Sequence, residues 1–192
     1  TTDKLLVFAT NGRFYTVGVD KLPGGRGTGE SLRLMLGLGN DVEIVEMFIH
    51  QPGAKLVVAA TDGRGFIVPE DEVVAQTRAG KQVLKVKGGE EAAAVARVSG
   101  DHLAVLGSNR KLLIFPLSEV PEMAKGTGIK LQSYTDAKLA DVASFTLDQG
   151  LTLPSGDRTR SFSKAELKDY IAERAKSGRV APSGFPRSGR LR

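Results

Sequence analysis

Short apolar runs alternate with turn residues along the chain, and this alternation itself repeats. The run Lys4-Leu-Leu-Val-Phe-Ala-Thr-Asn-Gly-Arg returns at residues 55–64 and, with changes, at residues 102–111. Thr10, Thr61 and Ser108 mark the same point of each copy, so the period is 51 and then 47 residues. A period of this size is typical of stacked or radially arranged units, none of which buries a core alone.

Each copy begins with a predicted β-hairpin. Asn11-Gly12 and Asp62-Gly63 favour a tight two-residue turn, because both central positions of such a turn need positive φ. Asn109-Arg110 holds the same place in the third copy without glycine. In the fourth copy, Ser155-Gly156-Asp157 follows an apolar run. We therefore expect four hairpins.

Two more strand-like segments follow each of the first three hairpins. They lie at residues 31–34 and 42–48, 82–86 and 93–98, and 129–132 and 142–147. Four strands in 47 to 51 residues are typical of a propeller blade. The sequence predicts one all-β repeat domain over residues 1–192, a β-propeller or β-pinwheel of about four four-stranded blades. The blades are expected at 3–53, 54–100 and 101–150, with a degenerate last blade and a basic tail at 151–192.

One segment predicts a helix. Ser163-Lys-Ala-Glu166 has the spacing of a capping box, and Leu167, Tyr170 and Ile171 fall on one helical face. We expect a short helix or helical turn near 164–176, ended by Gly178 and inserted in the all-β fold. A mixed α+β domain is the alternative.

Composition removes several classes of protein. The chain has no cysteine, which excludes disulfides and thiolate metal sites, and no apolar run approaches the roughly 18 residues of a membrane-spanning helix. It begins Thr-Thr-Asp rather than with Met, which indicates an excised piece of a longer protein.

The basic residues are concentrated at the end of the sequence. Residues 155–192 hold ten Lys and Arg against four Asp and Glu, whereas residues 1–154 are nearly neutral. A basic tail of this kind favours an anionic partner, nucleic acid first; a solvated solubility tail is the alternative.

The sequence offers no catalytic constellation. The glycine-rich segments 24–29 and 125–128 are each followed by a predicted strand, whereas a phosphate-binding loop needs a helix after it. Neither His50 nor His102 has another potential ligand at a spacing typical of metal sites, so we expect no metal site. The acidic connectors at 70–72 and 90–91 are expected to be solvated.

Basic residues recur at equivalent turns and loops, and these are the candidate binding residues. If the blades are equivalent, such residues lie along one edge at a regular spacing, which suits the phosphate backbone of duplex DNA. The alternative is that the turns are simply polar. The hairpin tips carry Arg13, Arg64, Arg110, Lys111 and Arg158, and the second loops carry Lys21, Arg26, Arg78, Lys81, Lys125, Lys130, Arg174, Lys176 and Arg179.

Several of these loops resemble a known family. The segments that carry the resemblance are residues 21–30, 61–68, 71–81 and above all 113–130, together with 164–179. In order, they resemble the C-terminal domain of the A subunit of DNA topoisomerase IV, a relative of the gyrase A tail. The resemblance covers essentially the whole chain.

Departures from the family pattern indicate which branch of the family the chain resembles. Gly24-Gly-Arg-Gly27 is a degenerate form of the basic, glycine-rich box that the gyrase tail uses to wrap DNA. This favours the topoisomerase IV branch. Tyr15, Tyr134 and Tyr170 match no catalytic context, so this piece is expected to be non-catalytic alone, with no catalytic residue. The family tail also has an earlier blade, and its absence here implies an open ring.

The resemblance implies non-sequence-specific binding of duplex DNA, which would position the transported segment for decatenation or relaxation. It implies a bacterial cytoplasmic, nucleoid-associated heterotetramer with the rest of the A subunit plus an ATPase B subunit. The cofactors ATP and Mg²⁺ would belong to that parent enzyme, with none in this domain, no membrane and no small-molecule substrate. The alternatives are a protein-interaction propeller that docks a chromosome-organising partner, or a gyrase-like DNA-wrapping tail.

Overall fold

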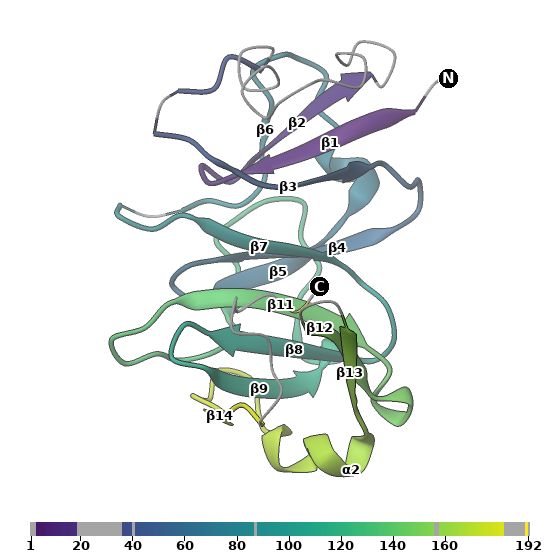
Figure 1. Cartoon of the computed structure of the whole chain (residues 1–192). Coiled ribbons are helices and arrows are strands. Elements are labelled where there is room, and N and C mark those ends of the chain that lie inside the picture. Colours follow the sequence, from purple (N-terminus) through teal and green to yellow (C-terminus); the bar gives the residue numbers. More distant parts are fainter. Residues whose placement is uncertain are drawn as a thin grey trace.

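The chain folds into a series of antiparallel sheets that follow one another in sequence order (Figure 1). The computed structural model describes residues 3–18, 36–39, 41–86, 88–155, 158–182 and 191. Within them lie three four-stranded sheets, a two-stranded hairpin and a short helix. This confirms the expected all-β repeat architecture. No helix in the described ranges is both long and apolar enough to span a membrane.

The three large sheets have the same strand order when the second is read in the reverse direction. The first sheet is β3-β1-β2-β6, built from β1 (Lys4–Ala9), β2 (Arg13–Gly18), β3 (Ile44–Ile49) and β6 (Lys81–Gln82). The second is β10-β5-β4-β7, built from β4 (Lys55–Ala60), β5 (Arg64–Pro69), β7 (Ala92–Arg97) and β10 (Ile129–Lys130). The third is β11-β8-β9-β14, built from β8 (His102–Gly107), β9 (Lys111–Pro116), β11 (Leu139–Phe145) and β14 (Arg179–Val180).

Hairpins form at the three predicted places, but their turns are not the tight two-residue type. The N–H of Gly12, Gly63 and Arg110 donates to the carbonyl three residues earlier, and Asn11, Asp62 and Asn109 are not among the residues with positive φ. Gly12 and Gly63 have φ of 81° and 88°, and Arg110 takes the corresponding place with φ of 65°. In each turn a side-chain oxygen of Asn11, Asp62 or Asn109 accepts the N–H of the residue two positions later, at 3.0 to 3.1 Å. This local bond explains why Asn or Asp stands at these tips.

The outermost strand of each large sheet comes from the following repeat. The sequence assigned residues 82–86 and 129–132 to the blades of their own repeats, but β6 pairs with β2 and β10 pairs with β5, each in the preceding sheet. Likewise β14 pairs with β9 of the third sheet. Each repeat thus contributes the outermost strand of the sheet that precedes it. We call this arrangement strand exchange, and it links consecutive repeats. The expected strand at 31–34 lies outside the described residues.

Consecutive sheets pack face to face through apolar residues that alternate along each strand. Leu6 and Phe8 share a buried cluster with Leu56 and Val58, and the opposite face of the second sheet shares one with Leu103 and Val105 of the third. No apolar cluster of the described residues joins the last hairpin to the first sheet. The arc of sheets is therefore open, as expected.

The last unit is shorter than a blade. The hairpin of β12 (Leu151–Ser155) and β13 (Arg158–Phe162) is followed by α2 (Lys164–Leu167) and a 3₁₀ turn at Lys168–Tyr170. The capping box of Ser163 and Glu166 is present, and Leu167 is buried against the third sheet. The helix is confirmed, but the 3₁₀ turn gives way to extended backbone at Ile171, well before Gly178. Three further 3₁₀ turns lie at Glu70–Val73, Leu117–Glu119 and Leu147–Gln149.

Gly63 at the second hairpin turn lies close to the backbone of another segment. A Cβ on Gly63 would lie 2.5 Å from the carbonyl oxygen of Gln132, on the segment that follows β10, whereas a Cβ on Gly53 meets nothing within 4 Å. Both glycines have similar positive φ, so they share the same backbone penalty. We expect Gly63→Ala to lower the free energy of unfolding by about 1–3 kcal/mol more than Gly53→Ala. Urea denaturation of both variants tests this, and equal losses would contradict it.

Candidate nucleic-acid interface

Strand exchange brings the cations of one repeat beside those of the next. Lys130 on β10 pairs directly with Arg64 at the second hairpin tip. Lys81 adjoins the Gln82–Arg13 pair in the first sheet, and Arg179 adjoins the Val180–Lys111 pair in the third. Since neighbouring strand residues point to opposite faces, only the Arg64–Lys130 pair shares a face. We call these six residues the cationic edge: Arg13, Lys81, Arg64, Lys130, Lys111 and Arg179.

The cationic edge follows the outer strands of three consecutive sheets. The strands β6, β10 and β14 are terminal in their sheets, so each group lies at the side away from the inner strands β3, β7 and β11. The backbone of each outer strand makes the ladder hydrogen bonds, which leaves the side chains free of any ladder role. The tip cations occupy equivalent positions in the three sheets, whereas Lys130 lies one residue along from the position of Lys81 and Arg179.

Acidic neighbours hold two of these cations only loosely. Asp62 lies 3.7 Å from Arg64, and Glu72 lies 3.9 Å from Lys81, with all four side chains at least a quarter exposed. Exposed ion pairs of this kind contribute about 0–1 kcal/mol, so a phosphate can compete for the cation. Arg13 donates from Nη1 to the carbonyl of Ala79 at 3.4 Å, on the loop before β6.

Among the other predicted binding residues, the structure places Arg174 beside this edge. Arg174 donates to the carbonyl of Lys130 at 2.6 Å, so it also lies beside β10. Arg78, Lys125 and Lys176 are exposed, whereas Arg110 is half-buried. Lys21 and Arg26 lie outside the described residues. Arg158 begins β13, but its side chain is also outside them.

Sequence reasoning missed one lysine at this edge. Lys85 is exposed, and its N–H donates to the carbonyl of Gly126 at 2.8 Å, next to Lys125. Lys85 lies within the apolar segment 82–86, whose sequence predicts a strand rather than a binding loop. The exchange of loops between repeats places it beside the glycine-rich segment of the third repeat.

A buried phenol supports the second hairpin tip. The ring of Tyr134 lies against Gly63 and Gly107, and burial, with a smaller contribution from the charge of Asp62, raises the pKa of Tyr134 above its ordinary value. The side chain therefore stays neutral and packs as an apolar support for the tip that carries Arg64.

An ionic cluster between the first two sheets corrects one sequence-based interpretation. Glu70, expected to be solvated, is fully buried. It accepts hydrogen bonds from the N–H of Gln51 and from Nε and Nη2 of Arg97, and it lies 3.0 Å from Nδ1 of His50. Asp71 lies 3.1 Å from Nε2 of the same imidazole. Glu70 is buried because it holds the linker at 49–51 against the second sheet, while Arg97 also contacts the Phe48 ring at 4.9 Å.

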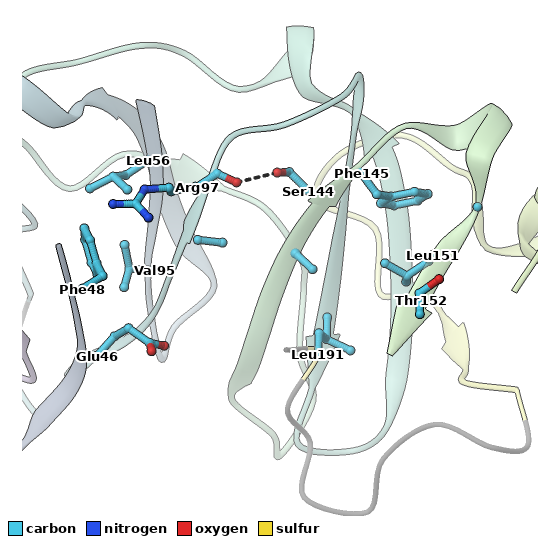
Figure 2. A pocket seen from close by; sticks show the side chains of 13 residues that line it. Glu46, Phe48, Leu56, Val95, Arg97, Ser144, Phe145, Leu151, Thr152 and Leu191 are labelled. Carbon is cyan, nitrogen blue, oxygen red and sulfur yellow. Dashed lines mark hydrogen bonds between the residues drawn. The ribbon is translucent and has the colours of Figure 1, made fainter. Parts of the chain in front are cut away.

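A cavity of about 540 Å³ lies where the inner strands and the last hairpin converge (Figure 2). Its lining is largely apolar, and its ionisable members are Glu46 and Arg97, of which Arg97 is bound to Glu70. The arrangement provides no pair of free acid and base groups for catalysis. In the described part of the chain, no group of three or more His, Asp and Glu side chains is placed to hold a metal ion.

Comparison with known proteins identifies relatives along the whole chain. Residues 3–51, 54–99 and 101–145 match the family described as DNA gyrase C-terminal domain, β-propeller. The A subunit of DNA topoisomerase 4 from Caulobacter vibrioides is 46% identical over 100% of this chain and 25% of its own length. The protein of the same name from Rickettsia bellii is 39% identical over 100% of this chain and 26% of its own length. The chain thus spans about a quarter of these relatives.

Solved structures share the same arrangement. The E. coli ParC C-terminal domain superposes with a TM-score of 0.78 at 25% identity, covering 96% of this chain and 78% of that one. The C-terminal domain of a DNA topoisomerase IV superposes with a TM-score of 0.76 over 96% of this chain and 61% of that one. At 17% identity, the second likeness shows the fold alone.

Proposed function

The chain belongs to the DNA gyrase C-terminal domain family of β-propellers, with A subunits of topoisomerase IV among its relatives, and we propose that it binds duplex DNA without sequence specificity. The bound duplex would be the segment that the parent enzyme transports during decatenation or relaxation. The domain would act as a guide beside the cleavage core rather than as a catalyst. Its place of action would be the bacterial nucleoid in the cytoplasm.

The cationic edge is the observation that carries this proposal. Strand exchange sets a loop cation on the outer strand of each of three successive sheets, next to the strand that carries the tip cation. Phosphate neutralisation needs positive charge at repeated intervals and no contact with base edges, which is what an edge of Lys and Arg side chains supplies. The absence of aromatic residues on the described outer strands β6, β10 and β14 favours backbone contacts.

The parent assembly is part of the same proposal. The rest of the A subunit, together with an ATPase B subunit, would complete a heterotetramer, and ATP and Mg²⁺ would bind there. The described residues of this chain do not form a set of carboxylates suited to Mg²⁺. No step of that chemistry is therefore assigned to them.

Salt dependence of binding tests the proposal. With six phosphate contacts, the affinity for a duplex should fall by about 10³ between 50 and 200 mM salt, because each contact releases condensed counterions. Fluorescence anisotropy with two duplexes of equal length and unrelated sequence should give matching curves. Salt-independent affinity, or a strong preference for one sequence, would refute non-specific binding through phosphates.

One observation favours a protein contact as a second function. Met47 is 48% exposed, although it pairs with Val7 as Val95 pairs with Val58 and Val142 with Val105. Val95 and Val142 are buried by the preceding sheet, so the first sheet presents an apolar position that its counterparts cover. A protein partner at this face would resist salt, in contrast to DNA at the cationic edge.

A further inference from the structure

Leu191, in the basic tail, lines the cavity of Figure 2, here called the axial cavity. Leu191 is only 2% exposed and packs in the apolar cluster that joins the third sheet to the last hairpin, with Leu151 and Leu153. Figure 2 shows its side chain across the cavity from Arg97. By contrast, Val180 in the same tail is 67% exposed. These two residues of the tail thus differ in exposure, and only Leu191 is buried.

A buried carboxylate receives the backbone of the same residue. Asp141 is fully buried, and its Oδ2 accepts the N–H of Leu191 at 2.9 Å while Oδ1 accepts the N–H of Val142 at 2.8 Å. In the repeat, Asp141 pairs with Leu106 as the apolar Ala94 pairs with Ala59. A carboxylate at a core position is costly unless donors reach it. The leucine N–H supplies a donor from fifty residues further along the chain.

Two described points of the tail lie at opposite edges of the third sheet. Val180 ends β14, the outermost strand of the third sheet, and Leu191 contacts β11, the innermost strand of that same sheet. Four strands are about 14 Å across from first to last, whereas eleven residues reach about 36 Å when extended. Eleven residues can therefore reach from one edge to the other, so Leu191 can occupy the cavity while β14 stays paired.

We propose that the axial cavity is a peptide-binding site whose ligand is the chain's own C-terminal segment. Its apolar wall takes the Leu191 side chain, and Asp141 takes the backbone N–H of the same residue. A charged side chain at this position would be buried without a partner, so the site favours leucine over an acidic residue. This site is separate from the cationic edge and does not depend on DNA binding.

Hydrogen exchange on the full chain tests the site directly. In Leu191→Asp and Asp141→Ala, amides of β11 and β12 should exchange about tenfold faster than in the wild type, since docking protects them. The second change installs the residue type that the second sheet has at this position, which keeps the strand compatible with its neighbours. Val180→Ala is the matched control in the same tail and should leave exchange unchanged. Wild-type protection in Leu191→Asp would overturn the proposal.

A peptide experiment separates docking from a general loss of stability. A fluorescent peptide with the sequence of residues 183–192 is titrated against the full-length Leu191→Asp chain, whose site is vacated, and against the wild type, whose site is occupied. We expect saturable binding to the variant and about tenfold weaker binding to the wild type, because the attached tail competes at a millimolar effective concentration. The same peptide carrying Leu191→Ala should bind neither. Equal binding to both chains, or none to the variant, would refute the site.

Discussion

Replacing Arg97 by methionine is expected to lower the free energy of unfolding by about 2–3 kcal/mol. The change leaves the fully buried Glu70 without the guanidinium that bonds both of its oxygens at 3.1 and 3.2 Å. Removing one partner of a buried ion pair costs about 3–5 kcal/mol, and the partial exposure of Arg97 reduces that figure. Urea denaturation followed by far-ultraviolet circular dichroism measures the loss.

A matched control separates the ionic contribution from the contact with the aromatic ring. Arg97 lies 4.9 Å from the Phe48 ring, and Arg160 lies 5.2 Å from the Phe162 ring on the exposed strand β13. Arg160→Met therefore removes a similar cation–π contact and should cost only about 0.5–1 kcal/mol. Adding Glu70→Gln to Arg97→Met should recover part of the stability, because the buried charge is gone. If Arg97→Met is no more harmful than Arg160→Met, Glu70 does not depend on this partner.

The sequence predicts the hairpins and the repeat because their causes are local. Asn11, Asp62 and Asn109 each bond a backbone N–H two residues away, and the capping box of Ser163 and Glu166 closes within four residues. The central strands are apolar at nearly every position, so alternate residues pack on the two opposite faces of each sheet. These signals depend only on neighbouring residues, so they can be read without knowing where the chain returns.

The pairing of each outer strand with the preceding sheet could not be predicted from local sequence signals. The strands β6 and β10 are two residues long, and their partners lie more than sixty residues away in sequence. Nothing in the local pattern distinguishes pairing within a repeat from pairing with the preceding one. The choice follows from how loops pack between sheets, which also decides that Glu70 is buried while its neighbours Asp71 and Glu72 are exposed.

The candidate site, too, was only partly predictable from the sequence. The sequence identified the tip and loop cations as equivalent positions, but not that tip and loop of different repeats meet at one edge. The Asp141–Leu191 contact had no signal at all, since a single aspartate in an apolar strand and a leucine in a basic tail are each unremarkable alone. Only the packed structure relates residues fifty positions apart.

Replacing Lys81, Lys130 and Arg179 together by alanine is expected to weaken binding to duplex DNA about 500-fold near 0.1 M salt. Each residue lies on an outer strand whose ladder bonds come from the backbone, so alanine leaves the strands paired. Each lost phosphate contact removes about 0.9 from the slope of log K against log salt, which at this concentration is about eightfold in affinity. The slope should therefore fall by about 2.7 in the same titration.

Lys55, Lys164 and Lys168 provide a control with the same change of net charge. Lys55 pairs with Glu122 at 2.6 Å and Lys164 with Asp148 at 2.9 Å, and neither lies on an exchanged strand. Their combined replacement by alanine should change affinity severalfold at most, because it alters only the long-range field. A loss equal to that of the outer-strand variant would mean that DNA responds to total charge rather than to the cationic edge. If both variants bind like the wild type, the outer strands are not the DNA-binding surface. A selective loss in the outer-strand variant would locate phosphate contacts at the strands that successive repeats exchange.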